Sequence, residues 1–234
     1  MSTRILAGIR VPDTSLISKI LAYAREVMDD GGYKHVMRSW LIGSAIISHM
    51  ASDMQQAIDL EVFAASTVLH DLGWMIENPL LSSPDKCFEV DGANGAREFL
   101  LKQGEKGHWD KHRLQLVWDA IALHTHPTVF AYKEPEVALA GAAIFTELMG
   151  VKVAQGAMGE SVITITEQEF DGIAEEFPRE GLKTHITGVL CGICKKKPQT
   201  TYSNFVGEVG EKYLDGYSRE GMRFVDMLDK YVPE

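Results

Sequence analysis

Hydrophobic residues recur with helical spacing along almost the whole chain. In the segment 181–195, apolar residues three and four positions apart fall on one stripe, which comprises Leu182, Ile186, Val189, Leu190 and Ile193. The same spacing predicts helices over residues 14–30, 34–52, 59–72, 88–102, 109–124, 135–149, 203–214 and 220–230. Because these segments cover most of the sequence, the pattern favours an all-α fold.

Glycine, proline and capping residues mark where these helices begin and end. Thr166 and Glu169 have the spacing of a capping box, and they open a further helix that ends before Pro178. Pro135 suits the first turn of its helix. Glycines that commonly stop a helix follow the expected segments at Gly31-Gly32, Gly73, Gly104 and Gly150.

The domain organisation follows from the length and from the near absence of strand patterns. A chain of 234 residues suits one domain, so residues 1–234 are expected to form a single helical bundle. Its core is expected over about residues 20–150, with a C-terminal helical part over about 165–232. Only residues 161–165 resemble a strand, and an extended loop is the alternative there.

Composition and charge argue against nucleic acids and membranes as partners of this protein. The formal net charge of −10 argues against a nucleic acid partner, because no basic stripe is present to neutralise phosphates. No secretion signal or membrane-crossing apolar stretch is recognisable, and three cysteines do not make a disulfide framework. We therefore expect a cytoplasmic protein without a membrane partner. Apolar residues on the C-terminal helices would permit a homodimer.

The adjacent pair His70-Asp71 is the strongest chemical signal in the sequence. It follows the apolar run 63–69, where an ionised carboxylate is costly to bury unless it is paired or bound to a metal. His35, His124 and Glu147 lie in other segments that are expected to be helical, each near a helix end. Side chains at the ends of separate helices can converge on one point without distorting any helix.

This combination of residue types is typical of a site for one divalent metal ion. Two histidines and two carboxylates suit zinc, iron, manganese or cobalt, and they disfavour the metals that prefer thiolates. We expect zinc first, with iron or manganese as alternatives. Such a site leaves a position open for water, whose pKa the metal lowers to about 7. The expected loops at 74–87 and 150–161 follow the ligand positions, where either a substrate lid or a plain connection would fit.

The order of these residues resembles the HD superfamily of metal-dependent hydrolases. It is most similar to the branch that contains the cyanamide hydratase-like proteins. Landmarks of that branch are matched in order at residues 33–38, 69–73, 88–93, 120–125, 145–150, 173–179 and Lys197-Pro198. The resemblance covers roughly residues 20–210 and implies an HD-type helical bundle.

The resemblance also assigns roles to individual residues. It implies that the metal is held by His35, His70, Asp71 and Glu147, although the family usually has an aspartate at the last position. Phe88 stands where dinuclear relatives have a histidine, so a single metal is expected. His124 and Asp71 are expected to act in catalysis. Candidates for the substrate pocket are Arg38, Trp74, Phe88, Thr125 and His126.

The activity implied by the resemblance is that of a hydrolase or hydratase. Metal-bound hydroxide would attack a small polar substrate such as a nitrile, and cyanamide would give urea. One alternative is a phosphohydrolase that acts on a nucleotide or a small phosphomonoester. Another is a non-catalytic module that binds a small molecule. The sequence contains no Gly-x-Ser-x-Gly elbow, P-loop or dinucleotide fingerprint, which disfavours the enzyme classes that use them.

Overall fold

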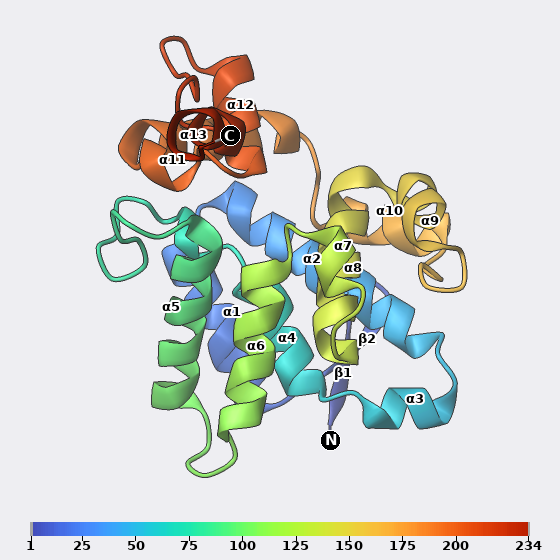
Figure 1. The fold of residues 1–234 in the computed structure, drawn as a ribbon. Helices are drawn as coiled ribbons and strands as arrows, with labels where there is room; N and C mark the ends of the chain where they lie inside the picture. Colours follow the sequence, from blue (N-terminus) through green and yellow to red (C-terminus); the bar gives the residue numbers. More distant parts are fainter. Residues whose placement is uncertain (1, 234) are drawn as a thin grey trace.

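Helices form most of the protein in the computed structural model, which describes residues 2–233 (Figure 1). Within those residues the chain forms thirteen α-helices, two single-turn 3-10 helices (η) and one short antiparallel hairpin. None of the helices in this part of the chain is both long and apolar enough to cross a lipid bilayer. The prediction of an all-α single domain is confirmed.

The elements follow one another with short connections. The N-terminal half contains β1 (Thr3–Leu6), β2 (Ile9–Pro12), α1 (Ser15–Val27), α2 (Asp30–Ser48), α3 (Ser52–Ala57), α4 (Leu60–Val68), η1 (Leu72–Trp74), α5 (Phe88–Gln103) and α6 (Lys111–Leu123). The C-terminal half contains α7 (Pro127–Phe130), α8 (Pro135–Met149), α9 (Val151–Met158), α10 (Glu167–Glu176), α11 (Leu182–Lys196), η2 (Pro198–Thr200), α12 (Phe205–Tyr213) and α13 (Phe224–Tyr231).

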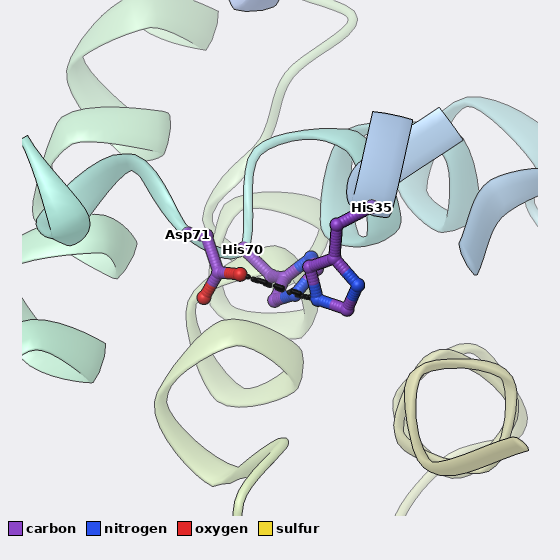
Figure 2. Close-up of side chains that lie close together, drawn as sticks. All are labelled: His35, His70 and Asp71. Carbon is purple, nitrogen blue, oxygen red and sulfur yellow. Dashed lines mark hydrogen bonds and ion pairs between the residues drawn. The ribbon is translucent and has the colours of Figure 1, made fainter. Parts of the chain in front are cut away.

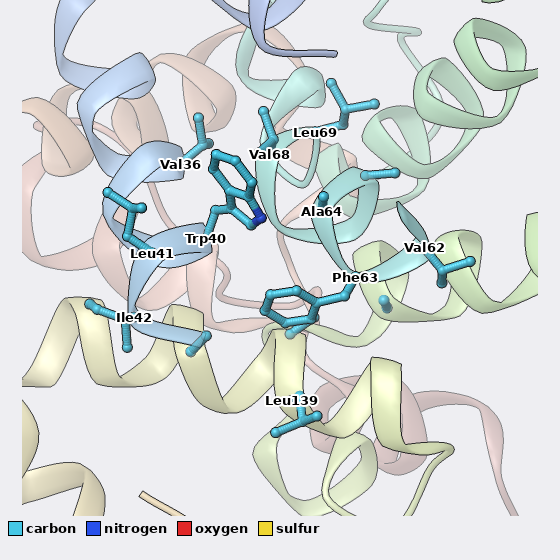
Figure 3. Packing of buried hydrophobic residues seen from close by; sticks show 14 of the residues in the cluster. Val36, Trp40, Leu41, Ile42, Val62, Phe63, Ala64, Val68, Leu69 and Leu139 are labelled. Atoms are coloured by element: carbon cyan, nitrogen blue, oxygen red, sulfur yellow. The ribbon is translucent and has the colours of Figure 1, made fainter. Parts of the chain in front are cut away.

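The main hydrophobic core lies between α2, α4, α6 and α8 (Figure 3). Trp40 on α2 and Phe63 on α4 are at most 1% exposed, and burying a side chain of this size contributes about 1.5–3 kcal/mol. A Cβ atom at Gly43 would come within 2.3 Å of the Phe63 ring. Glycine at this position therefore allows α2 and α4 to pack closely, which fixes the helix that carries His35.

A second, smaller hydrophobic cluster attaches the C-terminal helices to this core. Leu190 and Ile193 on α11 and Val206 on α12 pack with Trp74 and Phe88. In Figure 1 the C-terminal helices (red) accordingly lie over the end of the bundle where α5 begins. They close one side of the region to which His70-Asp71 belongs.

A buried ion pair strengthens this attachment. Lys197, at the end of α11, is 2% exposed, and its Nζ atom lies 2.7 Å from Oδ2 of Asp91 on α5. The same Nζ donates to the hydroxyl of Ser82 and to the carbonyl of Ser83, while Asp91 accepts from the backbone N–H and the hydroxyl of Ser83. The charges are thus paired and hydrogen-bonded, as burial requires.

Two sequence-based expectations about local structure were wrong, and one open alternative is now decided. Residues 151–158 form α9 inside the expected loop 150–161, and Gly150 and Gly159 bound this helix with φ values of 84° and 96°. Residues 161–165 form the loop that was the alternative to a strand. Gly31 and Gly32 lie inside α2, since the carboxylate of Asp29 accepts a hydrogen bond from the N–H of Gly32 and caps the helix earlier. His35 is therefore in the second turn of α2.

The N-terminal hairpin was not anticipated. Its strands have four residues each, too few for an alternating pattern to stand out from the neighbouring helical periodicity. Ala7 and Gly8 form the turn with φ values of 47° and 78°, the geometry that two-residue hairpins require. The hairpin packs through β2 against α2.

The Lys197–Asp91 pair gives a test of how the C-terminal helices are held. Lys197→Met would leave the Asp91 carboxylate buried without its partner, so the free energy of unfolding in urea should fall by about 3–5 kcal/mol. Lys196→Met is the matched control, because it breaks only the exposed pair with Glu77 and should cost at most about 1 kcal/mol. Equal losses in the two variants would contradict a structural role for the buried pair.

Candidate metal centre

The pair His70-Asp71 lies in a tight turn that packs against the start of α5. Helix α4 ends at Val68, and the chain turns through His70 and Asp71 into η1. A Cβ atom at Gly73 would lie 2.0 Å from the carbonyl oxygen of Phe88, and one at Gly92 would lie 2.9 Å from that of His70. Two glycines thus permit the close packing that points both side chains inward.

Three potential ligand atoms converge at this turn (Figure 2). Nε2 of His35 lies 3.1 Å from Nε2 of His70 and 3.3 Å from Oδ2 of Asp71. Nε2 of His70 lies 3.0 Å from the same Oδ2 atom. A metal bound at about 2.0–2.2 Å separates neighbouring nitrogen and oxygen ligands by roughly 2.9–3.5 Å, so the spacing fits one ion.

The hydrogen bonds of the two imidazoles fix which nitrogens point at the centre. Nδ1 of His70 donates to the carbonyl of Thr67 at 2.9 Å, and a carbonyl can only accept. Nδ1 of His35 donates to Oε2 of Glu147 at 2.6 Å. With both Nδ1 atoms used as donors, the two Nε2 atoms are left to face each other and a carboxylate, an arrangement that needs a positive charge between them.

The environment of Asp71 independently indicates a positive charge at this centre. Its side chain is 1% exposed, and neither of its carboxylate oxygens accepts a hydrogen bond. A buried carboxylate in this state is costly unless a cation compensates it. The donor set of two imidazoles and one carboxylate suits zinc, iron or manganese. The residues present therefore fit a divalent metal ion.

In the metal-free protein, a proton on His35 can supply the positive charge. Burial opposes the charge on this imidazole, but the carboxylates of Glu147 and Asp71 outweigh it and raise the pKa of His35 to about 9. Burial likewise opposes ionisation of Asp71, yet His70 and His35 hold the pKa of its carboxyl far below the usual range. A metal would therefore compete with this proton.

His124 lies beside the cluster in a neutral state. Its Nδ1 donates to the carbonyl of Ile121 at 2.6 Å, which leaves Nε2 as an acceptor 3.8 Å from Oδ1 of Asp71. Burial and the neighbouring His70 lower the pKa of His124 to about 3. A neutral imidazole that presents an acceptor next to the centre can accept a hydrogen bond from a water molecule there.

Glu147 is not placed as a fourth ligand, which corrects the sequence-based expectation. Its Oε2 binds the Nδ1 side of His35, away from the converging atoms, and its Oε1 accepts from Nε of Arg38 at 2.5 Å. Burial raises the pKa of Glu147, but His35 and Arg38 more than offset this and lower it. Glu147 thus orients His35 as an anion.

Arg38 is likewise not placed in the substrate pocket. Besides Glu147, its guanidinium donates to the carbonyls of Phe177 and Pro178, and the side chain is 2% exposed. Because these groups neutralise and hydrogen-bond the guanidinium of Arg38, it is not free to bind a substrate. The role that the geometry gives it is to hold Glu147 behind His35.

A cavity of about 260 Å³ opens beside the three ligand atoms. Of the pocket candidates from the sequence, Trp74, Phe88 and Thr125 line it. His126 does not line it, and its side chain is exposed at the start of α7. The remaining lining residues are His35, His70, Asp71, His124, Pro127, Ile144, Phe145, Leu148, Met149, Ile186, Leu190 and Phe205.

Most of the apolar lining was missed by sequence reasoning. Ile186 and Leu190 belong to the stripe that predicted their helix, so the apolar face was visible in the sequence. Periodicity indicates which face of a helix is buried, but it does not say against which other segment. The contribution of α11 and α12 to the cavity emerges only from the fold.

Comparison with known proteins adds no family assignment. No protein-family profile matches the chain, and no curated protein gives a significant sequence match to it. The resemblance to the HD superfamily therefore stays a prediction. The chemistry of the site is inferred from its side chains.

Metal binding should release a proton. Because the pKa of His35 is about 9 without metal, binding of a divalent ion at pH 7 should release about one proton per ion. Apparent affinity should rise about tenfold per pH unit up to pH 9 and level off above it. Calorimetric titration in two buffers of different ionisation enthalpy measures the release. Affinity that does not change between pH 7 and 9 would contradict this picture.

Glu147→Gln tests whether Glu147 orients His35 or ligates the metal. Loss of an outer carboxylate partner should weaken metal binding about 10–100-fold, whereas loss of a direct ligand should weaken it far more. Glu136→Gln is the control, because Glu136 is buried on the same helix and contacts the N–H of Asp59 instead. Competition with a chelator measures both affinities. Unchanged affinity in Glu147→Gln would contradict the orienting role.

Proposed function

We propose that this protein is a metal-dependent hydrolase or hydratase that adds water to a small uncharged electrophile, with a nitrile as the preferred substrate. The observation that carries the proposal is Asp71, whose two buried oxygens lack hydrogen-bond donors beside the Nε2 atoms of His35 and His70. A divalent metal held there would lower the pKa of a coordinated water from 15.7 to about 7.

His124 is the group best placed to move protons in this reaction. Its Nε2 atom accepts, because Nδ1 is fixed as a donor to the carbonyl of Ile121. In the hydration of a nitrile, the water oxygen forms a bond to the nitrile carbon while one carbon–nitrogen π bond breaks. Nε2 of His124 takes a proton from the water and passes it to the nitrogen. Both water protons end on nitrogen after tautomerisation, and the product is the amide.

The charge distribution disfavours the phosphohydrolase alternative. Among residues 2–233, no lysine or arginine lines the cavity, although phosphate esters are usually bound by such side chains. Arg38, the nearest candidate in sequence, is committed to Glu147 and two carbonyls. An uncharged substrate therefore suits the site better than a phosphomonoester.

The donor set leaves one further activity to consider. Two histidines and one carboxylate with open positions also bind Fe(II) in oxygenases. Analysis of the metal in protein purified without added metal or chelator narrows the choice. Zinc would favour the hydrolytic chemistry, whereas iron fits both activities, and an oxygen-consumption assay beside the nitrile assay would then separate them.

The proposal is tested by amide formation from nitriles and by the His124→Gln variant. The protein should form amide from cyanamide or benzonitrile and release no phosphate from p-nitrophenyl phosphate. His124→Gln should lower kcat about 10²–10⁴-fold with metal content unchanged. His112→Gln, an exposed change on the same helix, is the matched control and should retain full activity. Phosphate release without amide formation would contradict the proposal.

A further inference from the structure

The cavity has a polar end and an apolar body. The polar groups lie together at the metal-binding candidates, with His124 and Thr125 beside them. The hydroxyl of Thr125 donates to the buried carboxyl of Glu89, so it is held in place. The rest of the lining is hydrophobic: Trp74, Phe88, Pro127, Ile144, Phe145, Leu148, Met149, Ile186, Leu190 and Phe205.

This division predicts how a ligand would lie. In the described part of the chain, Asp71 is the one carboxylate that lines the cavity, and it belongs to the metal-binding group. A charged group against the rest of the lining would lose part of its hydration without gaining a charged partner, which is unfavourable. A hydrophobic group there would instead gain free energy by leaving water. Only the end at the ligand atoms suits a polar head.

The volume allows more than a minimal substrate. An apolar cavity of about 150 Å³ can hold a benzene ring. The present cavity of about 260 Å³ therefore has room for a monocyclic ring, or a short alkyl chain, together with a small polar head. A molecule as small and polar as cyanamide would leave most of the hydrophobic wall without contact.

We propose that the substrate is a neutral molecule with an aromatic or short aliphatic body, and that Ile186, Leu190 and Phe205 determine its size and shape. This inference rests on the proposed function for the nature of the reacting head. Acting on an organic nitrile R–C≡N, the protein would add one water to give R–C(=O)–NH₂, with no oxidant or reductant required. The expected substrates are thus hydrophobic nitriles.

The three proposed specificity residues come from elements other than those that carry the metal-binding candidates. Ile186 and Leu190 lie on α11, and Phe205 begins α12, whereas the candidate ligands come from α2 and the turn after α4. The buried pair of Lys197 and Asp91 holds α11 over the cavity. Changes at the C-terminal walls can therefore alter ligand size while leaving the metal-binding residues in place.

Binding of toluene to the full-length, chelator-treated protein tests the inference without relying on turnover. Toluene has the expected apolar body and no reacting head. It should bind saturably with one molecule per chain, detected by calorimetry or by a change in tryptophan fluorescence, whereas inorganic phosphate should not bind. Absence of saturable toluene binding up to its solubility limit would overturn the inference.

A matched pair of variants locates the binding site. Ile186→Gln places a polar group in the cavity wall and should weaken toluene binding at least tenfold. Val189→Gln is the control, since Val189 is half-buried on the same helix but lies outside this cavity, and it should bind toluene as the unmodified protein does. Ile186→Trp, which fills the cavity, should also abolish binding. Unchanged binding in both Ile186 variants would overturn the assignment of this wall.

A nitrile series connects the inference to the reaction. From acetonitrile to pentanenitrile, kcat/KM should rise about fourfold per methylene until the cavity is full. If cyanamide is hydrated but the series is flat and toluene does not bind, the proposed function stands and the apolar substrate class is overturned. If toluene binds but no nitrile is hydrated in metal-loaded protein, the apolar ligand class is supported and the hydratase is contradicted.

Discussion

The arrangement of the site depends on the need of one buried carboxylate for a compensating positive charge. Asp71 is almost completely buried, its oxygens accept no hydrogen bond, and its Oδ2 atom lies 3.3 Å and 3.0 Å from the Nε2 atoms of His35 and His70. Both imidazoles donate through Nδ1 to other groups, so their free nitrogens face the carboxylate as acceptors. Only a cation at that point makes the arrangement stable, and either a proton or a metal ion can provide it.

The surrounding fold holds His35, His70 and Asp71 in position and leaves a cavity beside them. Glu147 and Arg38 form a buried pair behind His35, so the orientation of that imidazole is set by charge as well as by packing. The C-terminal helices add hydrophobic residues to the cavity beside this centre, and the buried pair of Lys197 and Asp91 attaches them. The result is a polar centre at the end of an apolar cavity, where electrostatic interactions are weakly screened.

Most of the longer helices and the converging triad could be predicted from the sequence, because both depend on local patterns, whereas the short helices α3, α7 and α9 could not. The segment 135–149 matches α8 residue for residue, and the adjacency of His70 and Asp71 in an apolar run indicated a metal site. The position of Glu147 was predicted, but its role was not, since spacing does not say whether a carboxylate meets the metal or the far nitrogen of an imidazole. The cavity wall from α11 depends on long-range packing, which periodicity does not encode.

Binding of one divalent metal ion by His35, His70 and Asp71 can be measured by X-ray absorption spectroscopy on metal-loaded protein, with elemental analysis of the same sample. We expect one ion per chain with nitrogen and oxygen neighbours at about 2.0–2.2 Å, two of them imidazoles, and no sulfur neighbour at about 2.3 Å. The same sample prepared from Asp71→Asn should hold much less metal. A chain that retains no metal after loading, or one whose metal has sulfur ligands, would contradict metal binding by these three residues.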